Sequence, residues 1–433
     1  MSNIPEEDKK INPIKRLLNR GAKHKKSILA AKTISADHHK ISPQDIPSNA
    51  LQILYRLQDA EFEGYLVGGG IRDLLLNHHP KDFDIATNAS LNQVKKLFRN
   101  CRLIGRRFRI AHVYFHREII EVSTFPESES KKTVIGKIED DAKRRDFTIN
   151  ALYFDPISHN VFDFFTGFED LKNKTIRMIG DAKARYSEDP VRMLRAARFA
   201  AKLNFKIEPE TEKPIRKYAK LLNEISPARL FDEVIKLFYT GHALASLKEL
   251  RRLGLLGTLF PATDQLFDSP TKNFAELLVT HMLKNTDDRI AIGKPVAPTF
   301  LFAIFLWPPL IETIRSEIES GTSQNLAYYQ AVKTVLRDQA KRTMMPKRIS
   351  TGLQEIWALQ YRLEQRRPKY ILETLEHPRF RAAYDLLLLR SESGEDLDSI
   401  ASWWTEIQTV NETEQLEMVK NLTRKKREST RKK

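Results

Sequence analysis

The sequence has 433 residues, a net charge of +16 and one cysteine, Cys101. At roughly 150 residues per domain, this length predicts about three folding units with enough apolar material for a core. A single cysteine excludes an intrachain disulfide and a CxxC zinc site. The first residues lack the apolar core of a signal peptide, and the longest apolar run, 299–307, is too short to span a bilayer. We therefore expect a cytoplasmic protein without a membrane segment.

The positive charge is concentrated at the two ends of the chain. Residues 1–40 contain ten Lys or Arg and four Asp or Glu, and residues 421–433 contain seven and one. The two ends thus carry twelve of the sixteen net charges. A nearly balanced body between two basic arms is typical of proteins that bind a polyanion, although solubility alone would also explain such arms.

Hydrophobic periodicity first predicts a small region in which helices and strands alternate. In chain order we expect helix 50–58, strand 65–67, a break at the three glycines 68–70, helix 71–76, strand 83–87, helix 92–99 and strands 110–115 and 119–125. Beyond about residue 182 the pattern is helical, with helices expected over 190–203, 227–239, 243–253, 331–342 and within 356–404. The Trp403–Trp404 pair in that last stretch is expected to belong to a core and not to a ligand site.

The fold class is therefore α+β, with a small sheet domain on the N-terminal side followed by an all-helical neck, body and tail. We expect a basic flexible arm over 1–40, the sheet domain over 41–180, a helical neck over 181–240, a helical body over 241–415 and a basic tail over 416–433.

The most specific motif is a glycine-rich turn followed by two spaced aspartates. Gly68, Gly69 and Gly70 lead into a helix that carries Arg72, and Asp82-Phe83-Asp84 begins the next strand. Side chains alternate along a strand, so the two carboxylates point to the same side. Such a like-charge pair suits Mg²⁺, which binds a few carboxylates and completes its shell with water and phosphate oxygens. The glycines let backbone N–H groups approach phosphate, so this order of elements predicts a metal-assisted phosphate site.

The segment GGGIRDLLLNHHPKDFDIAT resembles the signature of the class II nucleotidyltransferases of the DNA polymerase β superfamily, which include bacterial poly(A) polymerases and CCA-adding enzymes. Two later blocks, RRDFTIN at 144–150 and EDPVR at 188–192, agree in order. The resemblance runs from about His38 to beyond Arg390 and implies a polymerase-β-like sheet domain. It implies Asp82, Asp84 and Asp146 as catalytic residues.

The resemblance also implies a set of nucleotide contacts. In such enzymes the residues that match Arg145 and Asp146 contact the ribose and triphosphate, and those that match Asp189 and Arg192 read the base edge. Asp146 and Asn150 are four apart, which predicts one helical turn between them. If the resemblance is set aside, simpler structural roles would explain these residues. Arg145 and Asp146 would form a surface Arg–Asp pair, and Asp189 and Arg192 would form an i,i+3 ion pair. The nucleotide-binding residues expected are Gly69, Gly70, Arg72, Arg145, Asn150, Asp189 and Arg192.

Glu121, expected on a neighbouring strand, is a candidate third carboxylate for the metals, or else a surface residue. One departure from the family pattern lies at Pro126, where relatives commonly have Arg after the position of Phe125. This departure puts in doubt any contact that the Arg makes in relatives. The charged linker 127–136 that follows has no assigned role.

A different block distinguishes the two activities within the class. LIGRRFRIAHV at 103–113 resembles the segment that marks bacterial poly(A) polymerases, and the C-terminal region resembles their arginine-rich C-terminus. The resemblance therefore implies a template-independent enzyme that adds AMP from ATP to RNA 3′ ends, with two Mg²⁺ ions and no membrane partner. RNA contacts are expected from Arg106, Arg107, Arg109, Arg424, Lys425, Lys426 and Arg427. A CCA-adding tRNA nucleotidyltransferase and a catalytically inactive RNA-binding protein remain the alternatives.

Overall fold

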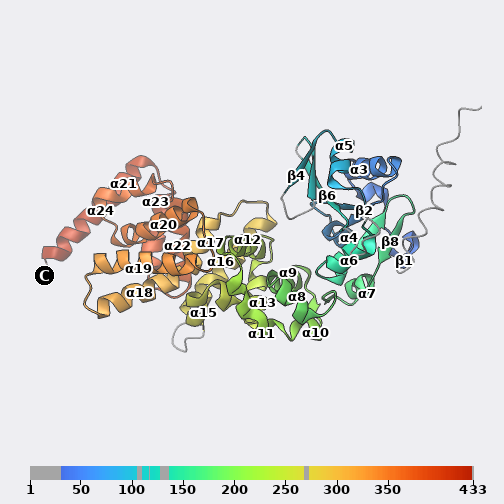
Figure 1. The fold of residues 1–433 in the computed structure, drawn as a ribbon. Coiled ribbons are helices and arrows are strands. Elements are labelled where there is room, and N and C mark those ends of the chain that lie inside the picture. The colour runs from blue at the N-terminus through green and yellow to red at the C-terminus, as the bar shows by residue number, and fades with distance from the viewer. Residues whose placement is uncertain (1–30, 105–109, 117, 127–135, 268–272, 432–433) are drawn as a thin grey trace, which may run out of the picture. The chain divides into compact units, whose positions relative to one another are not determined.

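The computed structural model describes residues 31–104, 110–116, 118–126, 136–267 and 273–431 (Figure 1). The chain forms two compact units. The first extends up to Arg185 and also contains Phe205–Glu212, and the second contains Tyr186–Asn204 and the chain from Lys213 onward. Apart from 181–185 and 205–212, the residues expected to form the helical neck and body belong to the second unit.

An eight-stranded mixed sheet organises the first unit. Its strand order is β1-β8-β7-β2-β3-β6-β5-β4, and only β3 and β6 pair in parallel within it. The strands are β1 Lys32–Ile34, β2 Gly64–Val67, β3 Asp84–Thr87, β4 Cys101–Ile104, β5 Ile110–Phe115, β6 Glu118–Thr124, β7 Leu152–Asp155 and β8 Asn160–Asp163. A separate parallel pair is formed by β9 Thr175–Ile176 and β10 Lys206–Ile207. The strands predicted at 65–67, 83–87, 110–115 and 119–125 are therefore confirmed, with small differences in their ends.

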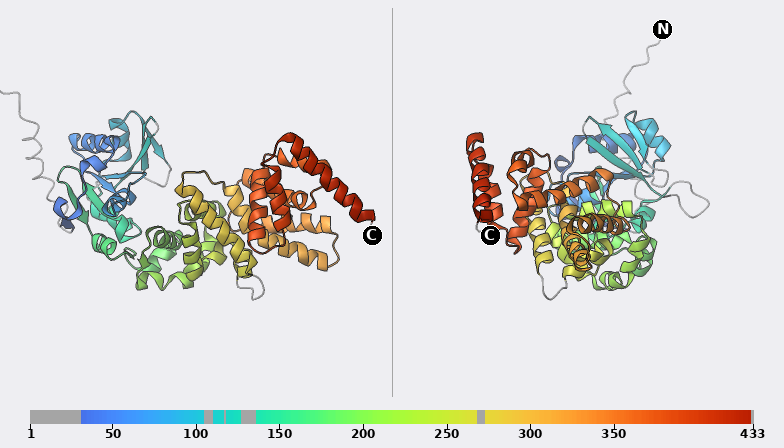
Figure 2. Two further views of the ribbon diagram at one scale, coloured as in Figure 1. Left: turned by 180° about the vertical axis from the view of Figure 1, so that it is seen from behind. Right: turned by 90° about the vertical axis from the view of Figure 1, so that its left-hand side faces the viewer.

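Helices cover both faces of this sheet. The helices of the first unit are α2 Ala36–His39, α3 Ser48–Asp59, α4 Gly69–Leu75, α5 Leu91–Leu97, α6 Ile138–Arg144, α7 Gly167–Lys172 and α10 Pro209–Glu212, with 3₁₀ turns η1 Pro43–Asp45 and η2 Thr148–Asn150. Helix α8, Ala182–Glu188, spans the boundary between the units. Helices α3 and α5 lie side by side against β2, β3, β4 and β5 (Figures 1 and 2).

The core of the first unit follows the alternation of side chains along β2. Tyr65 and Val67 point to the face covered by α6, where Tyr65 packs edge-on against Tyr153 and Phe162. Leu66, between them, points to the other face. Ala86, Phe125, Ile138 and Ala142 complete the cluster with these rings. The packed core fixes β2 and β3, whose ends carry the glycine turn and Asp84.

The span expected as a flexible arm is partly folded. Lys32–Ile34 pairs with β8 as the edge strand of the sheet, and His39 of α2 is buried, with its two ring nitrogens bonded to Ile41 N and His159 O. Residues 32–40 therefore belong to the sheet domain. The remainder of the expected arm, residues 1–30, lies outside the described residues.

The second unit is helical throughout its described residues, as predicted. Its elements are α9 Val191–Leu203, α11 Ile215–Tyr218, η3 Ala219–Glu224, α12 Pro227–Phe238, α13 Ala243–Arg252, α14 Leu256–Leu259, α15 Pro261–Phe267, α16 Phe274–Ala291, α17 Pro298–Phe305, α18 Trp307–Glu319, α19 Gln324–Ala340, α20 Lys347–Gln365, η4 Pro368–Tyr370, α21 Ile371–Leu375, α22 Phe380–Glu392, α23 Asp398–Ile407 and α24 Glu412–Arg431. Helices α18 and α19 form a hairpin in which the two helices lie side by side (Figure 2).

The apolar run at 299–307 is explained by this unit. It forms α17 and the first residue of α18, and Phe302 and Phe305 are fully buried against Phe260. A helix buried on all sides is apolar all round, which accounts for the run. In the described part of the chain, no helix combines the length and the apolar character that a bilayer span requires.

The basic C-terminal segment is helical, as the expected all-helical tail predicts. Residues 416–431 lie in α24. Repeated Glu, Gln, Leu, Met, Lys and Arg residues favour a helix even where few apolar side chains are available for packing.

Candidate functional site

The glycine turn, the first aspartate of β3 and an arginine meet at one place in the first unit. Gly68 has a φ of +78°, in the region where side chains are strained. A Cβ atom added to Gly68 would lie 3.4 Å from Nη1 of Arg145 and 3.5 Å from Oδ2 of Asp84. The turn therefore lies directly against one carboxylate and one guanidinium. A side chain at this position would fill the space between them.

The other two glycines are also closely surrounded. A Cβ at Gly70 would lie 3.2 Å from the carbonyl oxygen of Asp82, and one at Gly69 would lie 3.5 Å from Nη2 of Arg72. The backbone of α4 thus begins in close contact with the segment that carries the two aspartates. This confirms that the motif is compact in space as well as in sequence.

Strand register brings a third carboxylate to Asp84. Asp84 and Glu121 are Cα partners in the parallel pairing of β3 with β6. Burial, followed by the negative charge of Glu121, raises the pKa of Asp84 to about 6; Arg145 opposes this shift and Asp82 adds to it. Glu121 is half exposed, and its Oε1 lies 3.2 Å from Nε2 of His112 on β5.

This group of carboxylates fits a hard divalent cation. Asp82 lies before β3 and is exposed, and Asp84 is partly buried. In the part of the chain that the structure describes, no three His, Cys, Asp or Glu side chains are gathered closely enough to hold a metal ion by themselves. A site with few protein ligands, all of them oxygen, suits Mg²⁺, which keeps several waters and binds substrate phosphate. A cation there would also offset the repulsion that raises the pKa of Asp84.

A chain of buried polar contacts joins the glycine motif to the RRDFTIN block. Arg72 is buried; its Nε and Nη2 donate to Oδ1 of Asp73 at 2.8 and 2.6 Å, and its Nη1 donates to Oδ1 of Asn150 at 2.8 Å. Nδ2 of Asn150 then donates to Oδ1 of Asp146 at 3.0 Å. Asp146 and Asn150 therefore meet as their spacing predicts, but through the 3₁₀ turn η2 and not through an α-helical turn.

Arg145 is held by a second group of contacts. Its Nε donates to Oδ2 of Asp141 at 2.9 Å and to the hydroxyl of Tyr153 at 3.0 Å, and that hydroxyl donates to Asp141 at 2.6 Å. Burial raises the pKa of Tyr153 well above its ordinary value, so the phenol keeps its proton. Burial lowers the pKa of Arg145, but Tyr153 and Asp141 outweigh it and the net shift is upward. Nη1 of this permanently charged guanidinium faces the glycine turn.

Sequence reasoning did not identify Asp73, Asp141 or Tyr153. Asp73 follows Arg72 directly, and Asp141 precedes Arg145 by four residues on α6, a spacing that favours an ion pair. Of the two, only the Asp141 contact could have been found from spacing, because adjacent residues on a helix do not usually face each other. Tyr153 lies on β7, eight residues after Arg145, and no helical or strand period relates the two positions.

Asp189 and Arg192 lie in the second unit, at the start of α9. Oδ2 of Asp189 accepts from Nη2 of Arg229 at 2.8 Å, and Nη1 of Arg192 donates to Oε2 of Glu188 at 2.7 Å. The side chain of Arg192 is only 12% exposed. Each residue of this pair thus has an oppositely charged neighbour other than the i,i+3 partner considered from the sequence.

The predicted RNA contacts are described only in part. Arg106, Arg107 and Arg109 lie outside the described residues. Arg424 is exposed on α24, and Lys425, Lys426 and Arg427 follow it in the same helix.

Comparisons with known proteins agree with this arrangement. Residues 64–177 match the model of the poly A polymerase head domain, 204–267 that of the probable RNA and SrmB-binding site of polymerase A, and 320–433 that of the polymerase A arginine-rich C-terminus. Poly(A) polymerase I of Salmonella typhi is 47% identical over 410 residues, which cover 90% of this chain and 88% of the relative. The Escherichia coli O157:H7 protein of the same name is 45% identical over 410 residues, again 90% of this chain and 88% of the relative.

Similarity to CCA-adding enzymes covers less of the sequence. That of Lactobacillus helveticus is 40% identical over 207 residues, 46% of this chain and 52% of the relative. Among solved structures, the Thermotoga maritima CCA-adding enzyme complexed with tRNA_CCA aligns with a TM-score of 0.60 and 21% identity, and the alignment covers 87% of this chain and 86% of that chain. At this identity the match concerns the fold, which agrees with the predicted polymerase-β-like class.

A mixed sheet that holds a glycine turn against Asp84 and Arg145, together with the match to the poly A polymerase head domain, identifies the chain as a nucleotidyltransferase. Within that class, near-full-length similarity is found with one group of relatives. The chain belongs to the poly(A) polymerase I family of polynucleotide adenylyltransferases.

The raised pKa of Asp84 yields a prediction for Asp84→Asn in the absence of divalent cations. The folded pKa, about 6, exceeds the ordinary value of 3.8, so the wild type loses stability as the pH rises through 6 and recovers it below about 4. Asn carries no charge at any pH. We expect the variant to be more stable than the wild type at pH 8, by up to about 3 kcal/mol, since one pKa unit corresponds to roughly 1.4 kcal/mol.

The measurement is urea unfolding of both proteins with EDTA at pH 8 and at pH 4. The advantage of the variant should vanish at the lower pH. Asp59→Asn, at an exposed position at the end of α3, is the control and should change stability little at either pH. An Asp84→Asn protein that is less stable than the wild type at pH 8 would contradict the repulsion argument.

Proposed function

We propose that this protein adds AMP from ATP to RNA 3′ ends without a template and releases pyrophosphate. The observation that carries the proposal is the meeting of Asp84, Arg145 and the glycine turn at Gly68. It provides, within one small space, oxygen ligands for a cation, a fixed positive charge and a backbone that can approach phosphate. The full-length similarity to poly(A) polymerases supports AMP as the transferred group.

In the reaction, the RNA 3′-oxygen forms a bond to the α-phosphorus of ATP, and the bond from that phosphorus to the bridging oxygen of the β-phosphate breaks. The 3′-hydroxyl loses its proton, and pyrophosphate leaves with the electron pair of the broken bond. Catalysis of this kind depends on positioning and on charge neutralisation, so no nucleophilic side chain is required. This agrees with a site built of carboxylates, arginine and glycine.

The residues that would hold Mg²⁺ are Asp82 and Asp84, with Glu121 beside them. When bound, two Mg²⁺ ions supply positive charge that lowers the pKa of the 3′-hydroxyl and neutralises the triphosphate and the leaving pyrophosphate. Glu121 also contacts His112, so we propose that it adjusts the charge around Asp84 and contributes less as a direct ligand.

The chain's own cations then position the nucleotide. Arg145 presents Nη1 toward the glycine turn while its Nε is fixed by Asp141 and Tyr153, an arrangement that suits a phosphate oxygen. As the family pattern implies, Asp146 and Arg145 would contact the ribose and triphosphate. Asp146 is positioned for this by Asn150, whose amide oxygen accepts from buried Arg72. Gly69 and Gly70 at the start of α4 leave the backbone accessible. In the second unit, Asp189 and Arg192 supply an acceptor and a donor for the base edge.

The first test is nucleotide choice. Purified protein is incubated with Mg²⁺, an unstructured RNA and each NTP separately. We expect long ladders with ATP alone, because the proposed base contacts replace a template. Addition that stops after CCA on tRNA ends would identify a CCA-adding enzyme instead, and no incorporation with any NTP would favour an inactive RNA-binding protein.

Asp82→Asn and Asp84→Asn should each abolish AMP incorporation, since loss of either carboxylate weakens metal binding at the site. RNA binding should be unchanged. Asp59→Asn serves again as the matched control and should retain normal incorporation. Near-normal activity of either variant would disprove the assignment of these carboxylates.

Arg192→Ala should lower ATP use and reduce its preference over CTP. A site that hydrogen-bonds one base edge loses discrimination when the buried donor is removed. The ratio of kcat/KM for ATP and CTP measures this. Glu188→Gln is the control, because it removes the ion pair of Arg192 but leaves the guanidinium in place. If Glu188→Gln lowers the ratio equally, the effect belongs to the ion pair and not to base recognition.

Deletion of residues 423–433 should weaken RNA binding and reduce its salt dependence. The segment contains seven Lys or Arg and one Glu. Each lost phosphate contact is expected to lower the slope of log affinity against log salt by about one unit. RNA affinity is measured at several salt concentrations, with Lys206→Gln, an exposed cation of the first unit, as the control. An unchanged slope would show that the tail does not engage RNA.

A further inference from the structure

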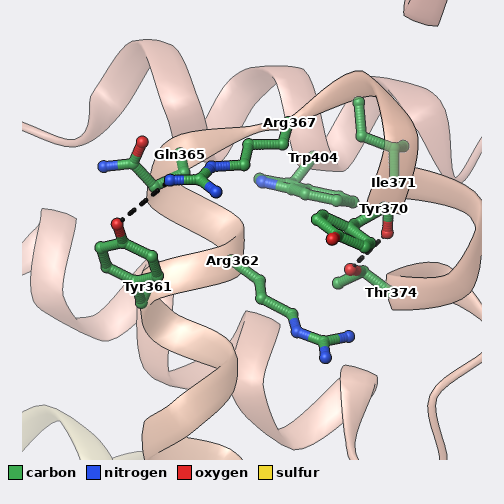
Figure 3. A pocket seen from close by; sticks show the side chains of 8 residues that line it. All are labelled: Tyr361, Arg362, Gln365, Arg367, Tyr370, Ile371, Thr374 and Trp404. Atoms are coloured by element: carbon green, nitrogen blue, oxygen red, sulfur yellow. Dashed lines mark hydrogen bonds between the residues drawn. The ribbon is translucent and has the colours of Figure 1, made fainter. Parts of the chain in front are cut away.

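A cavity of about 220 Å³ opens in the second unit, among α20, η4, α21 and α23 (Figure 3). Aromatic and arginine side chains dominate its lining. The lining residues are Tyr361, Arg362, Gln365, Arg367, Tyr370, Ile371, Thr374 and Trp404. All of them lie in the second unit, whereas the carboxylates Asp82 and Asp84 lie in the first. The proposed transfer chemistry uses none of the lining residues.

The inner part of the cavity is apolar and rigid. Trp404 and Ile371 are buried, and Nε1 of Trp404 donates to the carbonyl of Leu363 at 2.9 Å. The hydroxyl of Thr374 is occupied by the carbonyl of Tyr370 at 2.6 Å. These hydrogen bonds satisfy the polar atoms of Trp404 and Thr374 behind the cavity. An aromatic ligand that packs above this buried floor would therefore leave neither group without a partner.

The rim combines aromatic rings with cations that lie over their faces. The guanidinium of Arg362 lies 5.7 Å from the ring centre of Tyr370, and that of Arg367 lies 5.9 Å from the ring centre of Tyr361. Nη2 of Arg367 also contacts the hydroxyl of Tyr361 at 3.4 Å (Figure 3). Tyr361 is 47% exposed, so one of the principal rings remains accessible.

The local charge favours an anionic ligand. Residues 361–370 contain three arginines and one lysine against a single acid, Glu364, and Oε1 of Glu364 is engaged by Arg390 at 2.7 Å. Arg362 is paired with Glu373 at 2.8 Å, so the excess positive charge at the cavity rests mainly on Arg367. Alternating aromatic and basic side chains around an apolar recess is the arrangement with which proteins hold single-stranded nucleic acid, by stacking bases and contacting phosphates.

Size limits what the cavity accepts. Pockets for drug-sized ligands measure roughly 300–1,000 Å³, and this one is smaller at about 220 Å³. It matches one base with its sugar and phosphate outside. We propose that this cavity, the aromatic–arginine cavity, receives one unpaired base of the RNA substrate. Tyr361 stacks on the base, and Arg367 contacts the adjoining phosphate.

The proposal rests on the proposed action on RNA and deepens it. It gives the helical unit a discrete nucleotide-binding site, in addition to the diffuse attraction of a basic tail. Stacking is tolerant of sequence, because every base has an aromatic face. A site of this kind would bind the RNA strand whichever base occupies it, as an enzyme that acts on diverse 3′ ends requires.

The test is the affinity of the full-length protein for a fluorescently labelled, unstructured oligo(A) without ATP. Tyr361→Ala should weaken binding about tenfold, which lies within the range for loss of one stacked base, and Tyr361→Phe should retain most of the affinity. Arg367→Gln should weaken binding and lower the salt slope by about one unit, whereas Tyr361→Ala should leave that slope unchanged. Tyr329→Ala is the matched control, since Tyr329 on α19 is 71% exposed and does not line the cavity.

An abasic scan locates the base. An oligo(A) with one abasic nucleotide at successive positions should show one position at which the wild type loses about tenfold in affinity and the Tyr361→Ala variant loses none. If Tyr361→Ala binds oligo(A) as tightly as the wild type, or if no such position exists, the proposal is overturned and a protein ligand becomes the better occupant. Because the assay needs no catalysis, it decides this site even if AMP incorporation fails in every protein tested.

Discussion

The buried contact between Arg72 and Asn150 is the interaction on which the catalytic arrangement depends. A guanidinium removed from water is stable only when its donors are satisfied, and Asp73 and Asn150 supply the partners. The amide of Asn150 donates to Asp146, so the contact with Arg72 also fixes the position of Asp146. The start of α4 and the turn η2, more than seventy residues apart in sequence, are thereby locked together. The site can therefore be rigid before any nucleotide binds, which catalysis by positioning requires.

A second constraint comes from the sheet. Parallel pairing of β3 with β6 makes Asp84 and Glu121 neighbours, and burial together with repulsion from Glu121 raises the pKa of Asp84. Among the described residues, no close salt bridge to Asp84 relieves this repulsion. Arg145, the nearby cation, is bound through Nε to Asp141 and Tyr153, so its charge is shared. The protein thus keeps a negative site that is costly alone and is relieved when a cation enters, whereas a neutralised site would have no such affinity.

The sequence predicted the local features of this site well and the long-range ones poorly. The glycine turn, the spacing of Asp82 and Asp84, and the approach of Asn150 to Asp146 follow from short segments whose geometry depends on neighbouring residues. The contact of Arg72 with Asn150, 78 residues apart in sequence, depends on the tertiary fold, which no local period encodes. The prediction of a flexible arm was wrong at Lys32–Ile34, because pairing with β8 stabilises a strand that has little apolar character of its own.

Trp404 shows why a buried residue can also belong to a binding site. The sequence predicts a core role for it, and its complete burial and its bond to Leu363 agree. The same ring nevertheless lies directly behind the wall of a cavity, so one side chain can belong to the core and also support a binding site. In the proposed scheme, transfer chemistry and strand binding rest on separate units, with carboxylates in the sheet unit and aromatic and basic side chains in the helical unit. In sequence, the CCA-adding enzyme of Lactobacillus helveticus matches 46% of this chain, whereas a CCA-adding enzyme structure shares the fold over 87% of it, so the fold is retained over more of the chain than the sequence.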